Sequence, residues 1–508
     1  MKKNFLTWLL FFIIGALAIL GFAPFNLWFC TPFSFALLLC KIKNKKARQA
    51  SGISFAWGLG FYLAGINWIF VPLNTFGQLP IVGSLALMGL LMSYLALYPA
   101  LFAYGLSRFI PQKNTGIWII AVPIIWFLTE GIRGSLLTGF PWLLLGYSQT
   151  DGPLHSLAPL IGVRGISFVL CLISAALAQI LLTLRQPKLA WKPLLIVFLP
   201  FIISLLLENK LWTRLQPNRA TSLALIQGNT PQEKKWIPSE RWPIINQYSQ
   251  LTAENWGKDL IIWPEAAIPA FEMQLPHYLT DLDNLGKKHH SAIITGILDI
   301  DLKTNAYFND VIVLGKNNVP IYNKKEIPRY TKHHLVPFGE FIPLKPLFKR
   351  LANLFNLPYS SFSRGAYQQK NLVANNRYLA VATCYEIIFS QQVNANVNAQ
   401  TDFILTLSND SWFGHSIGPL QHMQIAQMRA RELQKPLIRV TNSGVTATTN
   451  AWGDITEKLP QFKTDVLTKT LIPTAGSTPF NRFGYKPLWF ITVLFSLYLL
   501  IPHGKKRK

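Results

Sequence analysis

The stretch Tyr378-Leu-Ala-Val-Ala-Thr-Cys-Tyr-Glu386 is an apolar strand that ends in a cysteine and a carboxylate. Two other runs are built alike, Asp259-Leu-Ile-Ile-Trp-Pro-Glu265 and Asp402-Phe-Ile-Leu-Thr-Leu-Ser-Asn409. Near-continuous apolar strands indicate burial on both faces, so we expect an α/β domain whose helices cover its sheets. Reactive groups in such sheets gather at the carboxyl ends of the strands, where Glu265, Cys384 and Asn409 stand.

The same alternation of strands and helices runs through residues 215–480, which hold nearly all the acidic residues. Strands are predicted at Ser222–Gln227, Asp259–Trp263, Ala292–Leu298, Tyr307–Leu314, Tyr378–Thr383, Phe403–Leu407, Leu437–Val440, Val445–Asn450 and Val466–Leu471. Helices are predicted at Ile244–Trp256, Tyr278–His289 and Met423–Leu433. The charged segment Arg329–Glu340, which contains proline and glycine, is typical of an ordered functional loop.

The rest of the chain is too apolar for a soluble protein. Half of the 508 residues are hydrophobic, 14% are charged, and the mean hydropathy is +0.27. A helix needs roughly 20 apolar residues to cross a bilayer. Eight spans are predicted, at about 5–22, 24–40, 52–72, 81–108, 116–131, 162–184, 190–208 and 486–502. The chain is thus divided into a membrane domain (1–214), an external domain (215–480), and a last helix with a basic tail (481–508).

The basic residues predict how the spans are oriented. The formal net charge is +25, and the Lys and Arg residues concentrate at Lys2–Lys3, Lys41–Arg48, Arg108–Lys113, Arg185–Lys192 and Lys505–Lys508. Counting spans places all five segments on one side, which the positive-inside rule makes the cytoplasm. Both termini are therefore predicted to be cytoplasmic and residues 215–480 periplasmic. This clustering beside membrane spans, without a zinc-finger or RRM-like signature, argues against nucleic acid as a partner.

Two membrane segments each have two interpretations. The apolar run Phe5–Gly21 is either an uncleaved first helix, which we favour because more spans follow at once, or a signal peptide with small residues at its cleavage site. The aromatic segment Thr138–Gln149 is either a re-entrant floor beneath the external domain or an interfacial anchor.

Among four cysteines, Cys384 is the one in the external domain; the others lie in apolar spans, where thiols behave as small hydrophobic groups. An isolated thiol is usually inert, but carboxylates and a lysine accompany this one. Glu265 can take the thiol proton if its pKa is raised. Lys332 can stabilise an oxyanion and keep the thiolate charged. These residues predict a cysteine-dependent acyl transferase or amidase.

No metal or other cofactor is predicted. The adjacent pairs His289-His290 and His333-His334 do not present two ligands on one helical face, and the sequence contains no Walker-type glycine motif.

These motifs together resemble the carbon–nitrogen hydrolase (nitrilase) superfamily and, within it, the apolipoprotein N-acyltransferase family. The resemblance covers essentially the whole chain, without a departure at a catalytic position. It rests on Trp263-Pro-Glu265, Tyr330-Thr-Lys332, Leu335–Glu340, Cys384–Glu386, Gln227–Gln232 with Trp236, and Thr138–Gln149. It implies a nitrilase-like αββα sandwich outside a multi-span helical domain of about eight helices, in a bacterial inner membrane.

The resemblance also implies a two-step reaction. Cys384, deprotonated by Glu265, would take the sn-1 acyl chain of a phospholipid, typically phosphatidylethanolamine, as a thioester. The α-amine of a diacylglyceryl-cysteine apolipoprotein would then accept the chain, which completes lipoprotein maturation. Lys332 would stabilise the tetrahedral intermediates, and Glu340 would position Lys332 or share proton transfer. The other supporting residues are Trp236 and Tyr385, which would shape lipid access, and Glu386 and Asn409.

Two other functions compete with this one. A membrane-tethered amidase or nitrilase-type hydrolase would use the same three residues and pass the acyl group to water, although eight spans exceed what a tether needs. A transporter with an external binding domain would carry charges inside its spans. Few are present: Glu130 and Arg133 stand at a predicted helix end and Arg164 at a helix start. Loops 231–243 and 357–367 are candidates for gating the site.

Overall fold

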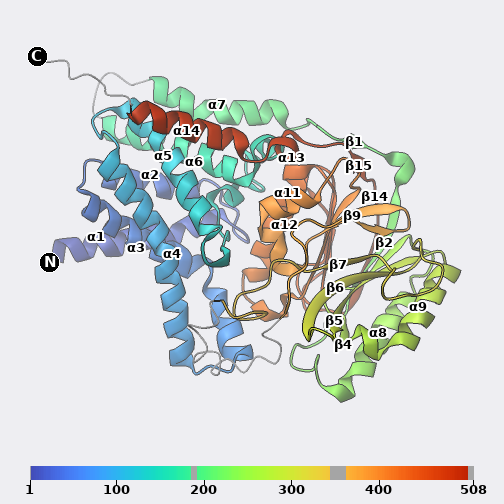
Figure 1. Ribbon diagram of the computed structural model, residues 1–508. Helices are drawn as coiled ribbons and strands as arrows, with labels where there is room; N and C mark the ends of the chain where they lie inside the picture. Colours follow the sequence, from blue (N-terminus) through green and yellow to red (C-terminus); the bar gives the residue numbers. More distant parts are fainter. Residues whose placement is uncertain (1, 185–190, 344–361, 501–508) are drawn as a thin grey trace, which may run out of the picture.

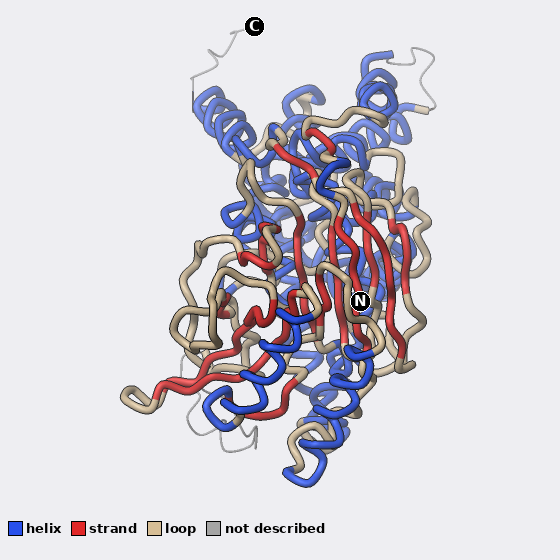
Figure 2. The backbone as a smooth tube through the Cα atoms, turned by 90° about the vertical axis from the view of Figure 1, so that its right-hand side faces the viewer, coloured by secondary structure: helices blue, strands red, loops and turns tan. Residues whose placement is uncertain are grey.

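The computed structural model describes residues 2–184, 191–343 and 362–500. Apolar helices form one half of the molecule, and two β-sheets with their covering helices form the other (Figure 1). Viewed from the half that contains the sheets, long strands run beside one another in front of the apolar helices (Figure 2). Most of the basic segment 185–192, the basic tail, and residues 357–361 of the candidate gating loop 357–367 lie outside the described residues.

Eight apolar helices match the predicted spans in position. They are α1 (Lys2–Leu17), α2 (Cys30–Ile42), α3 (Ala47–Gly65), α4 (Ile81–Phe109), α5 (Thr115–Arg133), α6 (Ala158–Thr183), α7 (Trp191–Leu207) and α14 (Lys486–Leu500). Within the described residues, four helical stretches are long and apolar enough to cross a membrane, namely Asn4–Gly21, Ile81–Phe109, Thr115–Arg133 and His155–Thr183. The stretches Cys30–Ile42, Trp191–Leu207 and Lys486–Leu499 are apolar but shorter. By length and composition, the described residues thus contain four possible membrane spans, or five if the bent pair Ala47–Gly65 and Asn67–Phe76 is counted as one span. The predicted number of eight spans was therefore too high by this criterion.

The span predicted at 52–72 is the bent pair. Helix α3 and the helical segment Asn67–Phe76 meet at an angle of 59°. The backbone leaves the helical region at Ile66, whose φ is −129°. Pro72 stands at the first position of the following helical turn, where its missing N–H does no harm. The apolar pattern alone did not reveal this break.

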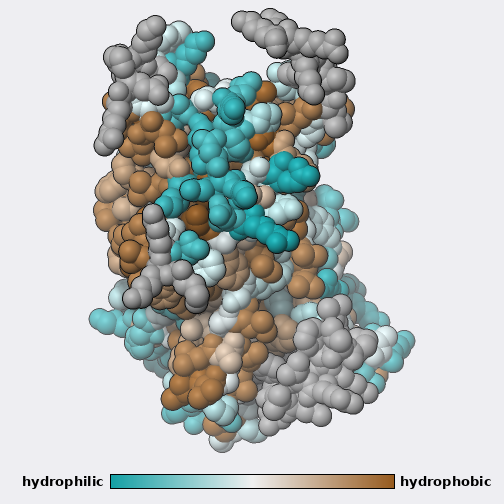
Figure 3. All heavy atoms as spheres, turned by 90° about the vertical axis from the view of Figure 1, so that its left-hand side faces the viewer, coloured by the Kyte–Doolittle hydropathy of each residue, from teal (hydrophilic) through white to brown (hydrophobic). Residues whose placement is uncertain are grey.

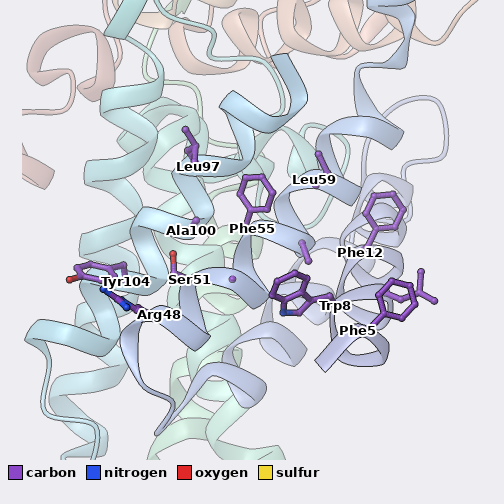
Figure 4. A pocket seen from close by; sticks show the side chains of 13 residues that line it. Phe5, Trp8, Phe12, Arg48, Ser51, Phe55, Leu59, Leu97, Ala100 and Tyr104 are labelled. Carbon is purple, nitrogen blue, oxygen red and sulfur yellow. The ribbon is translucent and has the colours of Figure 1, made fainter. Parts of the chain in front are cut away.

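Large apolar side chains on the outside of these helices mark a membrane surface. Phe5 is 68% exposed, Leu90 67%, Phe198 58% and Phe490 64%, and a bilayer would cover them. At the end of the molecule that carries the described N-terminus, hydrophilic side chains gather in the middle of a largely hydrophobic surface (Figure 3). An open apolar groove of about 700 Å³ lies over α3 between α1 and α4, with Arg48 and Tyr104 close together at one end (Figure 4).

The external domain is a four-layer αββα sandwich, as predicted. One sheet has the order β14-β2-β3-β5-β6-β7, with β4 also paired to β5, and the other has the order β13-β12-β11-β10-β9-β8. Leucine, isoleucine and valine side chains between the two sheets form a core. Helices α8 (Arg241–Ala253) and α9 (Pro276–Lys288) cover the first sheet. Helices α11 (Ser390–Asn396) and α12 (Gly418–Leu433) cover the second.

The strands of the first sheet are β2 (Thr221–Gln227), β3 (Leu260–Ile262), β4 (Ile268–Phe271), β5 (Ala292–Asp301), β6 (Ala306–Gly315), β7 (Arg329–Thr331) and β14 (Asp465–Leu471). Those of the second are β8 (Leu372–Ala374), β9 (Arg377–Val381), β10 (Phe403–Ser408), β11 (Leu437–Thr441), β12 (Ala447–Thr449) and β13 (Ile455–Lys458). Strands β2, β3 and β5 are parallel, as are β9, β10 and β11. A separate pair, β1 (Arg214–Leu215) with β15 (Thr474–Ala475), joins the two ends of the external domain.

Helix α12 is shared by the two halves of the molecule. Every residue from Gly418 to Leu433 except Leu420 is buried, including its polar residues. Gln421 Oε1 accepts hydrogen bonds from the indole N–H groups of Trp142 (2.8 Å) and Trp68 (3.2 Å). Glu432 Oε1 accepts the Val163 N–H at 2.7 Å. The hydrophobic core of the apolar helices therefore continues without interruption into the external domain.

The segment Thr138–Gln149 lies directly beneath this helix. Leu143, Leu145 and Tyr147 are at most 3% exposed, and two short helical turns, Leu136–Thr138 and Leu145–Gln149, flank an irregular stretch. A segment anchored at the interface would expose its aromatic rings to lipid head groups. The burial of this segment favours the interpretation as a floor under the external domain.

Candidate active site

The three predicted reactive residues follow three different strands and meet in one cluster. Glu265 follows β3, Lys332 follows β7, and Cys384 begins a helical turn, Cys384–Ile388, after β9. Lys332 Nζ donates to Glu265 Oε1 at 3.0 Å. The Cys384 thiol lies close enough to both groups for their charges to act on its pKa. The structure thus brings these three residues together at one edge of the sandwich.

Lys332 is held between two carboxylates. Its Nζ also donates to Glu340 Oε1 at 2.8 Å, and the side chain is 1% exposed. Burial alone would lower the pKa of Lys332, but the charges of Glu265, Glu340 and Cys384 raise it well above its ordinary value. Lys332 is therefore a permanent cation and does not act as a base. Glu340 is itself fixed by the Val336 N–H, which donates to Oε2 at 2.8 Å.

Glu265 is an ionised carboxylate with several donors around it. Asn309 Nδ2 donates to Oε1 at 2.9 Å, and the Asn409 backbone N–H donates to Oε2 at 3.1 Å. Burial would raise the pKa of Glu265, but Lys332, the Asn309 hydrogen bond and the charge of Lys235 together lower it. A raised pKa, the condition named above for Glu265 to take the thiol proton, is therefore not met, because a buried cation and donors to the charged form outweigh desolvation.

Cys384 carries a neutral thiol in the resting site. Burial, followed by the charge of Glu265, raises its pKa to about 12, and Lys332 only partly opposes this. The expectation that Lys332 keeps a thiolate charged was therefore wrong for the resting state. A carboxylate with a lowered pKa is too weak a base to deprotonate such a thiol before a reaction begins. Cys384 has φ +52°, in the left-handed region, so the turn around it is strained.

Glu386 joins the turn of Cys384 to the segment of Lys332. Its side chain is fully buried and accepts five hydrogen bonds. Oε2 accepts the Thr383 N–H (2.8 Å) and the Tyr330 hydroxyl (2.9 Å). Oε1 accepts the backbone N–H groups of His333 (2.8 Å) and His334 (2.9 Å) and Nε2 of Gln392 (2.8 Å). Glu386 thus fixes the separation of the segments that carry Cys384 and Lys332.

The other predicted supporting residues surround the cluster. The Tyr385 hydroxyl donates to the Gly139 carbonyl at 3.2 Å, which connects the nucleophile turn to the floor segment. Asn409 Nδ2 donates to Gln232 Oε1 at 2.6 Å, so Asn409 holds the loop after β2 while its backbone holds Glu265. Trp236 lies half-buried in that same loop.

Sequence reasoning missed three groups. Asn309, which contacts Glu265, is a polar residue inside the strand β6, and that is the signal that could have identified it. Lys235 is one of two adjacent lysines and could not be told from its neighbour. His422 on α12 lies behind the nucleophile, with Nε2 3.1 Å from the Cys384 carbonyl oxygen and Nδ1 3.0 Å from Asp410 Oδ1. Within the described ranges, histidine, cysteine and carboxylate side chains form no group of three able to hold a metal ion.

Comparisons with known proteins cover the whole chain. Residues 14–176 match a family described as the apolipoprotein N-acyltransferase N-terminal domain, and residues 222–479 match the carbon–nitrogen hydrolase family. The apolipoprotein N-acyltransferase of Photobacterium profundum is 48% identical over 479 residues, which is 94% of this chain and 92% of that protein. The apolipoprotein N-acyltransferase of Shewanella oneidensis is 43% identical over 517 residues, covering 100% of this chain and 97% of that protein.

Among solved structures, a nitrilase-superfamily protein of branch 10 from Saccharomyces cerevisiae aligns with 57% of this chain and 97% of its own, at a TM-score of 0.37 and 15% identity. An amidase from a Nesterenkonia species aligns with 53% of this chain and 95% of its own, at a TM-score of 0.37 and 12% identity.

Proposed function

This chain belongs to the apolipoprotein N-acyltransferase family of the carbon–nitrogen hydrolases, and on that premise we propose that the transferred acyl group is carried as a thioester on Cys384. Glu265 accepts and returns the protons, and Lys332 stabilises the oxyanions. The observation that supports this assignment is the buried cluster in which Lys332 lies 3.0 Å from Glu265, with the neutral thiol of Cys384 within reach of both charges.

In the first half-reaction, the Cys384 sulfur attacks the ester carbonyl carbon of a membrane phospholipid, with the sn-1 chain of phosphatidylethanolamine as the preferred donor. The thiol proton moves to Glu265 while the carbon–sulfur bond forms. Collapse of the tetrahedral intermediate breaks the bond to the glycerol oxygen, and that oxygen takes the proton back from Glu265. Lys332 faces the negative charge that forms and disappears in this sequence.

In the second half-reaction, the neutral α-amine of a diacylglyceryl-cysteine apolipoprotein attacks the thioester. One amine proton passes to Glu265, the carbon–sulfur bond breaks, and the sulfur recovers that proton. The products are an amide on the lipoprotein and the free thiol. The order of events requires ping-pong kinetics, because the lysophospholipid leaves before the acceptor reacts.

The contact between site and membrane domain supports lipids as both substrates. Tyr385 donates to Gly139 in the floor segment, and α12 packs against the apolar helices directly behind Cys384. A soluble enzyme would have to extract each acyl chain from the bilayer at about 0.8 kcal/mol per CH₂. A site held at the membrane surface avoids most of that cost.

The orientation derived from the basic segments is part of this proposal. It places the protein in the bacterial inner membrane, with both termini in the cytoplasm and residues 215–480 in the periplasm. The proposal takes the shorter helix α2 to cross the membrane as well; on that count the described basic loops Lys41–Arg48 and Arg108–Lys113, which follow α2 and α4, both lie on the cytoplasmic side.

Intact-protein mass spectrometry tests the proposal. The wild-type enzyme, incubated with phosphatidylethanolamine in detergent, should gain one acyl group on Cys384, and the Cys384→Ala variant should gain none. The matched control Cys30→Ala removes a half-buried thiol in α2 and should behave as wild type. A diacylated lipopeptide should then discharge the enzyme and become N-acylated. Release of free fatty acid alone would contradict transfer and favour the hydrolase.

A further inference from the structure

A second lysine lies buried beside the reacting groups. Lys235 is 3% exposed, and its Nζ donates to the backbone carbonyl oxygen of Glu265 at 3.2 Å. Among the described residues this carbonyl is the one hydrogen-bond acceptor that Lys235 reaches, so two of its three N–H donors have no protein partner there. A buried ammonium with one neutral acceptor is expensive, because burial strongly disfavours the charged form. Its presence at this position therefore calls for a compensating negative charge.

The loop that carries Lys235 is fixed at two points to the active site. Asn409 Nδ2 donates to Gln232 Oε1 at 2.6 Å. The amide of Asn442 forms two further bonds with the backbone of Thr230, at 2.9 and 2.7 Å. Asn409 thus holds both Glu265 and the loop that carries Lys235, so the Lys235 ammonium is not a flexible surface charge.

The charged groups that act on Lys235 are those of the reaction. The pKa of Lys235 is lowered to about 8 by burial, against the opposing charges of Glu265 and Cys384. In return, the Lys235 charge is one of the causes that lower the pKa of Glu265. The two other charged groups of the cluster are Lys332 and Glu340, and their opposite charges largely neutralise each other. Lys235 thus balances the charge of Glu265.

We propose that Lys235 is a positioning residue that holds Glu265 through its carbonyl oxygen and supplies a second positive charge to the Glu265–Cys384 pair. This inference rests on the proposed function. During acylation one negative charge moves from the Glu265 carboxylate to the sulfur and the carbonyl oxygen as the proton moves the other way. Lys332 cannot move with that charge, since two carboxylates hold it. Lys235 has two N–H donors without a partner among the described residues, and these donors stabilise the negative charge as it moves from Glu265 to the sulfur and the carbonyl oxygen.

The acylation half-reaction separates this role from a structural one. Acylation of Cys384 by phosphatidylethanolamine is followed by intact mass between pH 6 and pH 9.5, without an acceptor, so that the α-amine of the acceptor does not contribute to the pH profile. The head-group amine of the donor titrates alike for wild type and variants, so only a difference between their profiles reports on Lys235. Wild-type acylation should decline above about pH 8 as Lys235 loses its proton. Lys235→Met should acylate roughly tenfold more slowly, the factor that accompanies one pKa unit. It should also lack the alkaline decline. Lys235→Arg should keep most of the rate and shift the decline beyond the measured range.

Lys234→Met is the matched control, because Lys234 is exposed and adjacent; it should leave rate and profile unchanged. A wild-type profile without an alkaline decline would overturn the inference even if no Lys235 variant folds. So would a Lys235→Met variant that is slower by the same factor at every pH, which is the mark of a structural role. A wild-type enzyme that never acquires an acyl group on Cys384 would overturn the proposed function, and the inference with it.

Discussion

Replacing Glu386 by Gln should loosen the turn that carries the nucleophile. The glutamine oxygen can still accept the three bonds now made to Oε1, from His333, His334 and Gln392. Its NH₂ group then faces the Thr383 N–H and the Tyr330 hydroxyl, which are both donors to Oε2 at present. The hydroxyl can turn and accept, but the backbone N–H cannot, so one buried donor loses its partner.

The magnitude follows from these contacts. An unpaired buried N–H costs about 1–3 kcal/mol, and the remaining bonds lose roughly half their strength when the acceptor is no longer charged. Burial raises the pKa of Glu386, so a neutral side chain recovers part of the desolvation energy. We expect a net loss of about 2 kcal/mol in the free energy of unfolding. Because a chain of 508 residues unfolds with a large entropy change, this loss lowers the midpoint of thermal unfolding by only about 2 °C.

Thermal unfolding in detergent micelles measures the loss of stability, and the rate of Cys384 acylation measures the effect on the active site. Because Glu386 fixes the separation of Cys384 and Lys332, we expect the acylation rate to fall even at temperatures where the variant remains folded. Glu326→Gln is the control, since this exposed carboxylate accepts one local bond, from Asn323. If Glu386→Gln melts and acylates as wild type and the control do, the reasoning about these five hydrogen bonds is refuted.

Three further predictions concern the same site and the orientation of the chain. Lys332→Met should lower the acylation rate by about 10²–10³, the usual loss of one oxyanion donor, and a rate within tenfold of wild type would count against that role. Alkylation of resting Cys384 by iodoacetamide should rise roughly tenfold per pH unit between pH 5.5 and 7.5, because burial raises the thiol pKa to about 12; a plateau in this range would reveal a thiolate instead. In intact cells, an impermeant maleimide should label Lys303→Cys on the external domain but not Lys45→Cys in the basic loop, and the reverse pattern would invert the orientation.

Much of the fold was predictable because buried strands appear in the sequence as near-continuous apolar runs. All nine predicted strands are present, with ends shifted by at most three residues. The missed strands have four residues or fewer, and pairing with their neighbours creates them rather than their own composition; they are β1, β4, β7, β8, β13 and β15. The spans were less predictable. Hydropathy locates apolar helices, but their lengths depend on where the backbone breaks, as it does at Ile66.

The active site, like the fold, was only partly predictable from the sequence. Glu265 and Cys384 could be identified because each follows a strand that is visible in the sequence. Lys332 was identified from the charged segment Arg329–Glu340, since the short strand before it was not predicted. The pKa values could not be predicted, because they depend on Asn309 and Lys235, which reach Glu265 from distant segments. The function of Glu386 as an anchor was equally hidden, since its five donors come from three segments of the chain.

Helix α12 has a consequence for how the protein unfolds. Its side chains belong at once to the core of the apolar helices and to the layer that covers the second sheet. Removing the apolar helices would break the bonds that Trp142 makes to Gln421, Arg429 to Tyr147, and Val163 to Glu432, and would expose a continuous hydrophobic surface. We therefore expect two domains that are distinct in sequence to unfold as one cooperative unit, and the catalytic half not to fold on its own.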